Sequence, residues 1–263
     1  MTAKPTPAST CAPSGSWLTA ANLKEGSDIL VVRYADPVPE PVGTAGTTGQ
    51  RYILSNAVSV AVQTGTSTLA CDTDITGSGA SGITRKCMVP TSSDACSTLC
   101  GTGGSPLGDT RKMVVRIYYV SPCNVPASGS ACNGTSDDGG TPIPTLKRLE
   151  MTTSSWSVIP IAEGVEYMKL QYGVDSSPTT ANASTGLIGD GVPDTYKDAP
   201  ALADYANTVS VRVDLLVRNP EKSAGYSTSK TYNLGVSPSA PGSPNITIGP
   251  FTDSYRRHVY AAE

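Results

Sequence analysis

The sequence predicts a mainly β, α+β domain built from antiparallel sheets. Two observations support this prediction. Glycine and proline account for 26 and 21 of the 263 residues, and both favour turns over long helices. Several short segments also alternate apolar and polar residues with the period of two that is typical of strands. We therefore expect a disordered leader at residues 1–16, followed by one β-rich domain at residues 17–263.

The strands expected in the N-terminal half are short. Asp28–Tyr34 is an apolar run, and Tyr52–Gln63 and Lys112–Val120 alternate with period two. Between the last two, residues 64–111 hold four cysteines and little apolar sequence, so burial alone would hardly order this insertion. Leu146–Met151 is expected to pair with Lys112–Val120 as an antiparallel hairpin.

The C-terminal half contains the clearest alternation in the chain. Across Val209–Arg218 the odd positions are apolar and the even positions mostly polar, so one face should pack and the other should be largely solvated. Asp198–Asn207 is expected to form a short helix, and Ile161–Glu166 a single helical turn. The further strands expected in this half are Met168–Val174, Lys230–Leu234 and Tyr255–Tyr260.

Seven cysteines accompany a single histidine, which disfavours a Cys/His zinc site and favours disulfides in an oxidising compartment. Cys123 and Cys132 are expected to pair, because a loop rich in Pro, Gly and Ser separates them between two predicted strands. Cys11 is expected to be the unpaired thiol. The sequence leaves open how the remaining disulfide candidates pair: Cys71, Cys87, Cys96 and Cys100.

An acidic glycine turn begins at Asp190, in the segment DGVPD. Carboxylates at short spacing around a glycine allow oxygens to converge on a hard cation, so the predicted ligands of a calcium ion are Asp175, Asp190 and Asp194. Ser176–Gly189 separates the first of these from the other two, so such a site depends on closure of that loop. The alternative is an Asp-Gly turn whose side chains bond local backbone amides.

Other chemistry has little support in the sequence. The net charge is −3 and the 19 basic residues are scattered, which argues against nucleic-acid binding. His258 lies beside two arginines, and no nucleophile-elbow motif accompanies it, so we expect no enzyme. If two of the predicted strands are neighbours, four arginines would form either a solvated or salt-bridged face or an anion site: Arg212, Arg218, Arg256 and Arg257.

The order of the C-terminal segments resembles that of PilW-like minor pilins of bacterial type IV pili. The series is GVEYMKLQYGVD, GDGVPDTY, NTVSVRVDLLVRNPE, KTYNLG and SYRRHVYAA. The resemblance extends over roughly Glu25–Tyr34, Lys112–Asp175 and Asp190–Ala262. It implies a pilin-like or pseudopilin-like domain of a structural minor pilin that helps to prime pilus assembly and forms the tip complex that presents an adhesin.

The resemblance also implies partners and a location. The partners would be other minor pilins, the major pilin and the tip adhesin, and the location the pilus or cell surface, reached through the inner membrane and periplasm. Pilins carry a hydrophobic N-terminal helix that anchors them in the inner membrane, whereas Met1–Ser16 is polar and no apolar run here approaches the ~18 residues of a membrane span. We expect that helix to lie outside this sequence. The sheet that it covers would then be exposed or covered by a second sheet.

A secreted β-rich adhesin or ligand-binding module is the alternative function. Long disulfide-tied loops on a rigid scaffold commonly carry recognition. Trp17 and Trp156 lie outside those loops, so an aromatic sugar-binding platform is not evident.

Overall fold

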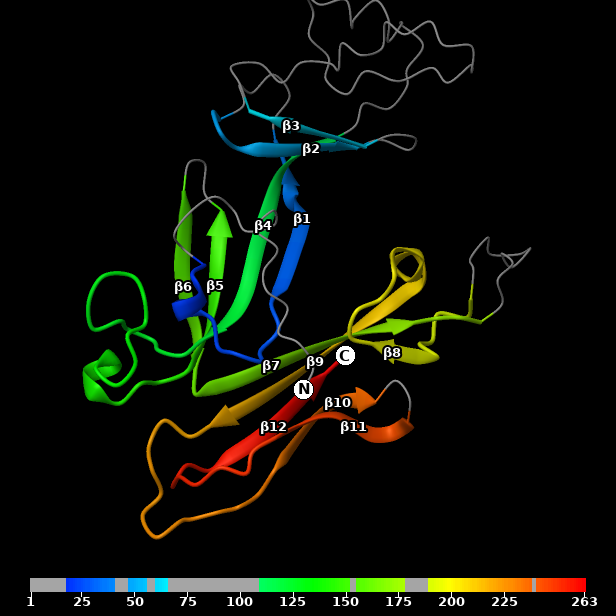
Figure 1. Cartoon of the computed structure of the whole chain (residues 1–263). Helices are drawn as coiled ribbons and strands as arrows, with labels where there is room; N and C mark the ends of the chain where they lie inside the picture. The colour runs from blue at the N-terminus through cyan, green and yellow to red at the C-terminus, as the bar shows by residue number, and fades with distance from the viewer. Residues whose placement is uncertain are drawn as a thin grey trace, which may run out of the picture. The chain divides into compact units, whose positions relative to one another are not determined.

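The computed structural model describes residues 18–40, 47–55, 60–65, 109–151, 155–177, 189–237 and 240–263. Over these residues the chain is mainly β, with antiparallel strands and a few short 3₁₀ helices (Figure 1), which confirms the predicted fold class. The expected leader, nearly all of the insertion at 64–111 and five of the seven cysteines lie outside the described residues.

The strands are β1 (Leu30–Pro39), β2 (Arg51–Ser55), β3 (Val60–Thr64), β4 (Asp109–Ser121), β5 (Thr145–Met151), β6 (Trp156–Glu163), β7 (Val165–Val174), β8 (Thr195–Lys197), β9 (Thr208–Arg218), β10 (Tyr232–Ser237), β11 (Ala240–Ile248) and β12 (Arg257–Ala262). The 3₁₀ helices are η1 (Ala20–Asn22), η3 (Asp137–Gly140) and η4 (Leu202–Asn207). One sheet has the order β3-β2-β4-β5-β6, with β1 paired to β4, a second has the order β12-β9-β7-β8, and β10 and β11 form a third.

The described residues divide into two compact units. Unit 1 takes its residues from Met1–Leu30, Tyr118–Arg148 and Val158–Glu263, and unit 2 from Val31–Ile117 and Leu149–Ser157. The first sheet draws its strands from both units, whereas the second and third sheets belong to unit 1.

In unit 2, the single strand expected at Tyr52–Gln63 is in fact the antiparallel hairpin of β2 and β3, so that prediction was wrong. Because apolar and polar residues alternate on both sides of the reversal, the sequence pattern did not show that the chain turns back between β2 and β3. Tyr52 is buried in this unit, and its hydroxyl accepts a hydrogen bond from the Thr47 N–H at 2.9 Å. Lys112 on β4 forms an ion pair with Glu40 at 3.0 Å.

The turn between β6 and β7 corrects the helical turn expected at Ile161–Glu166. Strand β6 continues to Glu163, and Gly164 takes the left-handed conformation with φ +82° before β7 begins at Val165. A β-carbon on Gly164 would collide with the carbonyl oxygen of Arg218 on β9. Glycine is therefore required here both by the backbone conformation and by the close approach of the neighbouring strand.

One of the two faces of β9 differs from the expectation. The even-numbered face, predicted to be solvated, holds Leu216 at 0% exposure, packed against Tyr232 and Leu234 of β10. The odd-numbered face packs through Val213, Leu215 and Val217, as predicted, while Val209 and Val211 remain 43% and 36% exposed. The prediction of a largely solvated even-numbered face was wrong, because the third sheet, β10 and β11, covers that face.

Two smaller predictions have clear outcomes, and one strand was not predicted. Strand β5 lies next to β4, as expected for Leu146–Met151. The short helix expected at Asp198–Asn207 is the 3₁₀ helix η4, which begins at Leu202. Strand β11 was not predicted, because the prolines in its sequence, APGSPNITI, are typical of loops.

Candidate functional site

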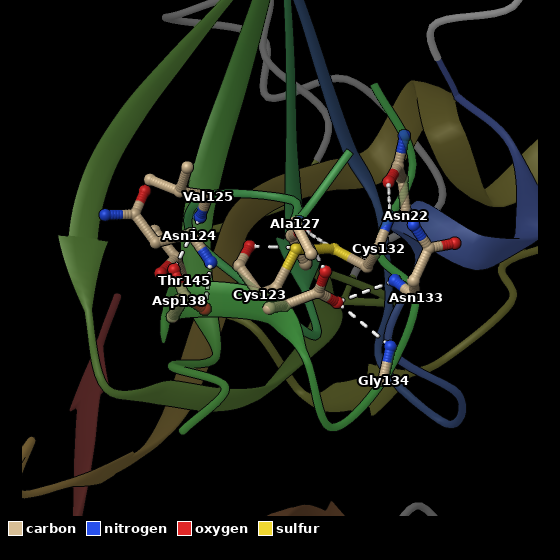
Figure 2. Close-up of a disulfide and its surroundings, with 12 residues drawn as sticks. Asn22, Cys123, Asn124, Val125, Ala127, Cys132, Asn133, Gly134, Asp138 and Thr145 are labelled. Atoms are coloured by element: carbon tan, nitrogen blue, oxygen red, sulfur yellow. Dashed lines mark hydrogen bonds between the residues drawn. A yellow bond between two sulfur atoms is a disulfide. The ribbon is translucent and has the colours of Figure 1, made fainter. Parts of the chain in front are cut away.

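The loop between β4 and β5 in unit 1 is closed by a disulfide. Cys123 and Cys132 are bonded, with their Cα atoms 5.8 Å apart, and both side chains are buried. This confirms the predicted pair. Figure 2 shows the bond among residues of the same loop, with Asn22 beside Cys132. The bridge fixes the two ends of a segment that contains little regular structure.

Asp137 holds the interior of this loop. Its side chain is fully buried, and its carboxylate accepts three backbone N–H bonds, from Ala127 at 2.8 Å, Asn133 at 2.6 Å and Gly134 at 2.9 Å. These bonds, above all that from Ala127, hold the pKa of the Asp137 carboxyl below its ordinary value of 3.8, although burial opposes the shift. The Asp137 carboxylate thus satisfies backbone N–H groups that regular secondary structure would otherwise pair.

Asp138 organises the other side of the same loop. Its oxygens accept the N–H groups of Asn124 at 3.0 Å, Val125 at 2.6 Å and Ile143 at 2.8 Å. Its φ of 52° lies in the left-handed region, which aspartate tolerates better than most residues. Neither aspartate was predicted from the sequence. The signal was present as the run Asp-Asp-Gly-Gly, which is typical of a turn that uses side-chain caps.

The disulfide-tied loop is also bonded to the first described segment of unit 1. Asn22 is buried, and its amide donates to the Ser130 carbonyl at 2.9 Å and accepts from the Cys132 N–H at 3.0 Å. A depression of about 370 Å³ opens beside the loop, and Val125 at its rim is 61% exposed. Its lining residues include Asn124, Pro126, Ile143 and Glu163.

The acidic turn lies at the end of β7. Asp175 is buried and accepts the Gly191 N–H at 2.8 Å and the Ser177 N–H at 3.0 Å, and the bond from Gly191 is the main cause of its lowered pKa. Asp194 accepts the Ser176 N–H at 2.7 Å, which likewise lowers its pKa. A β-carbon at Gly189 would collide with the Asp175 carboxylate, so glycine is required there as well.

The structure therefore brings Asp175 into contact with the segment that carries Asp190 and Asp194. The Asp190 side chain accepts the Val192 N–H at 2.9 Å, so all three carboxylates bond local backbone amides. Calcium binding by these residues stays a prediction. In the described part of the chain, one group of three potential metal ligands lies within 4.8 Å, namely Cys123, Cys132 and Asp137, and its sulfurs are joined to each other.

The four arginines singled out in the sequence lie on two neighbouring strands or directly beside them, and each contacts a carboxylate or an aromatic ring. Arg257 is almost completely buried and forms two-pronged contacts with Glu166, at 2.6 and 3.0 Å, and with Asp253, at 2.7 and 2.6 Å. Arg212 pairs with Asp214 at 2.9 Å.

The other two arginines lie over aromatic rings. Arg218 is 4.1 Å from the centroid of the Tyr255 ring, and Arg256 is 4.5 Å from that of Tyr226. Arg212, Arg218 and Arg257 form ion pairs and Arg256 is exposed, which corresponds to the solvated or salt-bridged face, the first of the two alternatives for these arginines. His258, the residue considered for catalysis, is exposed on β12, with its ring 4.6 Å from that of Tyr260.

Comparison with known proteins adds one finding. The family model of PilW, described as type IV pilus-assembly protein W, matches residues 132–263, which is half of the chain. The matched region begins at the second cysteine of the disulfide and contains the acidic turn and the whole of the second and third sheets. No curated protein and no solved structure gives a significant match. Among the described residues, no helix has the length and apolar character needed to cross a membrane.

Proposed function

The chain belongs to the PilW family of type IV pilus-assembly proteins, and from this premise we propose that it is a minor pilin of the pilus tip. Membership places it in type IV pilus assembly and associates it with the cell envelope or the pilus. The proposal goes further: the β-rich domain packs against other minor pilins, primes assembly together with them, and contributes to the tip complex that presents an adhesin to the outside.

The observation that carries the proposal is the extent of the family match. It covers strands β5 to β12, so the shared part is a scaffold of strands rather than a single motif. Most of the polar side chains that sequence reasoning considered for chemistry bond to backbone or to each other, as the contacts of Asp175, Asp194 and Arg257 illustrate. The proposal accordingly assigns no catalytic activity.

The disulfide supports the proposed location. Disulfides form and persist in oxidising compartments, which include the bacterial periplasm and cell surface, and Cys123–Cys132 lies buried at the base of the loop. The proposed partners are the other minor pilins, the major pilin and the tip adhesin.

A deletion strain tests this function. Cells that lack the gene should carry few or no surface pili, and a plasmid copy of the full-length gene should restore them. Site-specific photo-crosslinkers placed at exposed positions such as Val211 should capture other minor pilins in the complemented strain. Normal numbers of pili in the deletion strain, together with no crosslink to any pilin, would contradict the proposal.

A ligand-binding module is the second candidate, and the depression beside the disulfide-tied loop favours it. This depression combines apolar lining residues with the carboxylate of Glu163. Binding of the purified chain to a glycan array, lost when Val125 is replaced by Asp, would support this candidate. The minor-pilin proposal requires no such binding.

A further inference from the structure

Most of the outer sheet edges in unit 1 are blocked, either by hydrogen bonds from other segments of the chain or by prolines in the edge strand. Strand β8 covers only the end of β7, and the rest of that edge is satisfied by the preceding chain: the Asp28 N–H donates to the Met168 carbonyl at 2.8 Å, and the Asp28 carboxylate accepts the Leu170 N–H at 2.8 Å. The edge of β7 is therefore closed to a partner strand.

The other edges are blocked as well. The buried amide of Gln171 accepts from the Val236 N–H at 2.6 Å and donates to its carbonyl at 2.7 Å, which occupies the outer side of β10. Strand β11 contains Pro241 and Pro244, and β6 contains Pro160. Proline on an edge strand removes a donor and hinders the docking of another chain.

Strand β12 carries none of these devices. It is the terminal strand of its sheet, its six residues contain no proline or lysine, and its pairing with β9 runs from Arg257 to Ala262 without a bulge. Proteins that avoid edge-to-edge pairing usually protect such a strand. Apart from the inward-pointing charge of Arg257 at its start, β12 lacks such protection, which indicates that pairing at this edge is tolerated or used.

The hydrogen bonding shows which backbone groups face outward. The Asn219 N–H donates to the Arg256 carbonyl at 2.9 Å, so these opposite residues form a hydrogen-bonded pair of the antiparallel ladder. Because such pairs alternate, residues 258, 260 and 262 bond to β9, while the N–H and C=O groups of residues 257, 259 and 261 point away from it. Among the described residues, no backbone bond reaches that outer side.

The side chains along this edge are accessible. Tyr260 is 57% exposed, and its ring meets the exposed ring of His258 edge-on at 4.6 Å. Ala261 and Ala262 are also exposed and are too small to obstruct an incoming strand. The edge thus combines unpaired backbone groups with two aromatic rings on one face.

We propose that the free edge of β12 pairs with β12 of a second copy of this chain, antiparallel and with the two-fold axis at Val259. Charge complementarity favours this occupant and this direction. The strand is preceded by Arg256 and followed by Glu263. Antiparallel pairing brings the basic end of each copy next to the acidic end of the other, whereas parallel pairing would bring like charges together.

The position of the axis follows from the outward groups. A two-fold at Val259 places Arg257 opposite Ala261 of the second copy and Val259 opposite itself, so every outward residue of the strand meets another outward residue. The same register places His258 opposite Tyr260 of the second copy, and aromatic cross-strand pairs of this kind add stability. This interface goes beyond the proposed pilus function, because it is a property of the isolated chain.

Sedimentation velocity of the purified chain over a range of micromolar concentrations tests this interface. We expect a concentration-dependent monomer–dimer equilibrium. Ala261→Pro should shift the dimerisation constant at least ~10-fold towards monomer, since it removes an outward N–H while leaving the bonds between β12 and β9 in place. Ala261→Ser keeps the N–H and should dimerise like the unmodified chain.

A second variant guards against an effect of proline on folding. Tyr260→Lys introduces charge repulsion at the edge without changing the backbone and should also yield monomer, with a circular dichroism spectrum unchanged from the unmodified chain. A chain that stays monomeric at the highest concentration would overturn the proposal. A dimer that persists in both Ala261→Pro and Tyr260→Lys would overturn it equally, because it would use another surface.

Discussion

At the scale of single residues, buried charged side chains organise two parts of the described structure. Asp137 is fully buried, yet it remains satisfied because it accepts three backbone N–H bonds. Arg257 is buried between Glu166 and Asp253 and lies 3.6 Å from the centroid of the Phe251 ring. Groups of this kind stabilise a fold only while all partners are present, because a lone buried charge is costly.

Asp137 should make the stability of the protein depend on pH. Its pKa in the folded state is below the ordinary value of 3.8, so the unfolded chain binds the proton more readily. The free energy of unfolding should therefore be at its plateau above about pH 5 and fall as the pH drops through the folded-state pKa. Urea unfolding of Asp137→Asn at pH 6 and pH 3 should show a smaller difference between the two pH values than the unmodified chain.

Asp190→Asn is the matched control, because its side chain is exposed and makes a single local bond to Val192. It should keep the full pH dependence. An equal pH dependence in Asp137→Asn and Asp190→Asn would show that the buried carboxylate does not contribute.

Arg257 should be far more important to stability than its neighbour. Arg257→Met leaves Glu166 and Asp253 without their main partner, and removal of one member of a buried ion pair typically costs about 3–5 kcal/mol. Arg256→Met removes an exposed residue that contacts the Tyr226 ring, a contact worth about 0.5–1 kcal/mol. Denaturant unfolding measures both. Similar losses for the two variants would contradict the importance given to the buried network.

Calcium binding at the acidic turn can be tested by thermal unfolding. If Asp175, Asp190 and Asp194 share an ion, millimolar calcium should raise the melting temperature of the unmodified chain and leave that of Asp190→Ala unchanged. Magnesium at equal concentration controls for ionic strength. No shift in the unmodified chain would leave only the turn that bonds local amides, which the hydrogen bonds already describe.

At the scale of elements, alternation located the strands better than it assigned their faces. β4, β5, β7 and β9 lie where their periodicity predicts them. The packing of β9 could not be predicted, because its burial depends on β10 and β11, and the prolines of β11 concealed that partner. The hairpin of β2 and β3 was missed for a related reason: continuous alternation does not show where a chain reverses.

The candidate sites also combine one feature that could be predicted from the sequence with others that could not. The pairing of Cys123 with Cys132 could be predicted from their spacing between two strands. The roles of Asp137 and Asp138 could not, because they depend on which backbone N–H groups a disulfide-tied loop turns inward. Sequence alone indicates that Asp-Asp-Gly-Gly forms a turn, but it does not identify the donors.

The corrected view of β9 makes a direct prediction about its two faces. Leu216→Ala should lower the free energy of unfolding by about 2–5 kcal/mol, because Leu216 is fully buried against the third sheet. Val211→Ala should cost less than about 1 kcal/mol, since Val211 is 36% exposed. Equilibrium denaturation of the two variants measures the difference. A greater loss of stability from Val211→Ala than from Leu216→Ala would contradict the burial of the even-numbered face of β9.

At the scale of the whole molecule, the chain is a set of antiparallel sheets whose loops are held by a disulfide and by side-chain bonds to backbone. The PilW match covers the sheets of unit 1 that contain most of the buried residues described above. A scaffold of this kind suits a subunit that is positioned among other subunits. Its function in assembly would then depend on its exposed faces and edges rather than on one reactive group.

The most direct test of this account is the protein content of sheared, purified pili. Quantitative mass spectrometry should detect this chain in the filaments at a small fraction of the amount of the major pilin, and a strain without the gene should yield few filaments. Filaments that assemble in normal amounts and contain none of the chain would contradict the proposed role as a minor pilin.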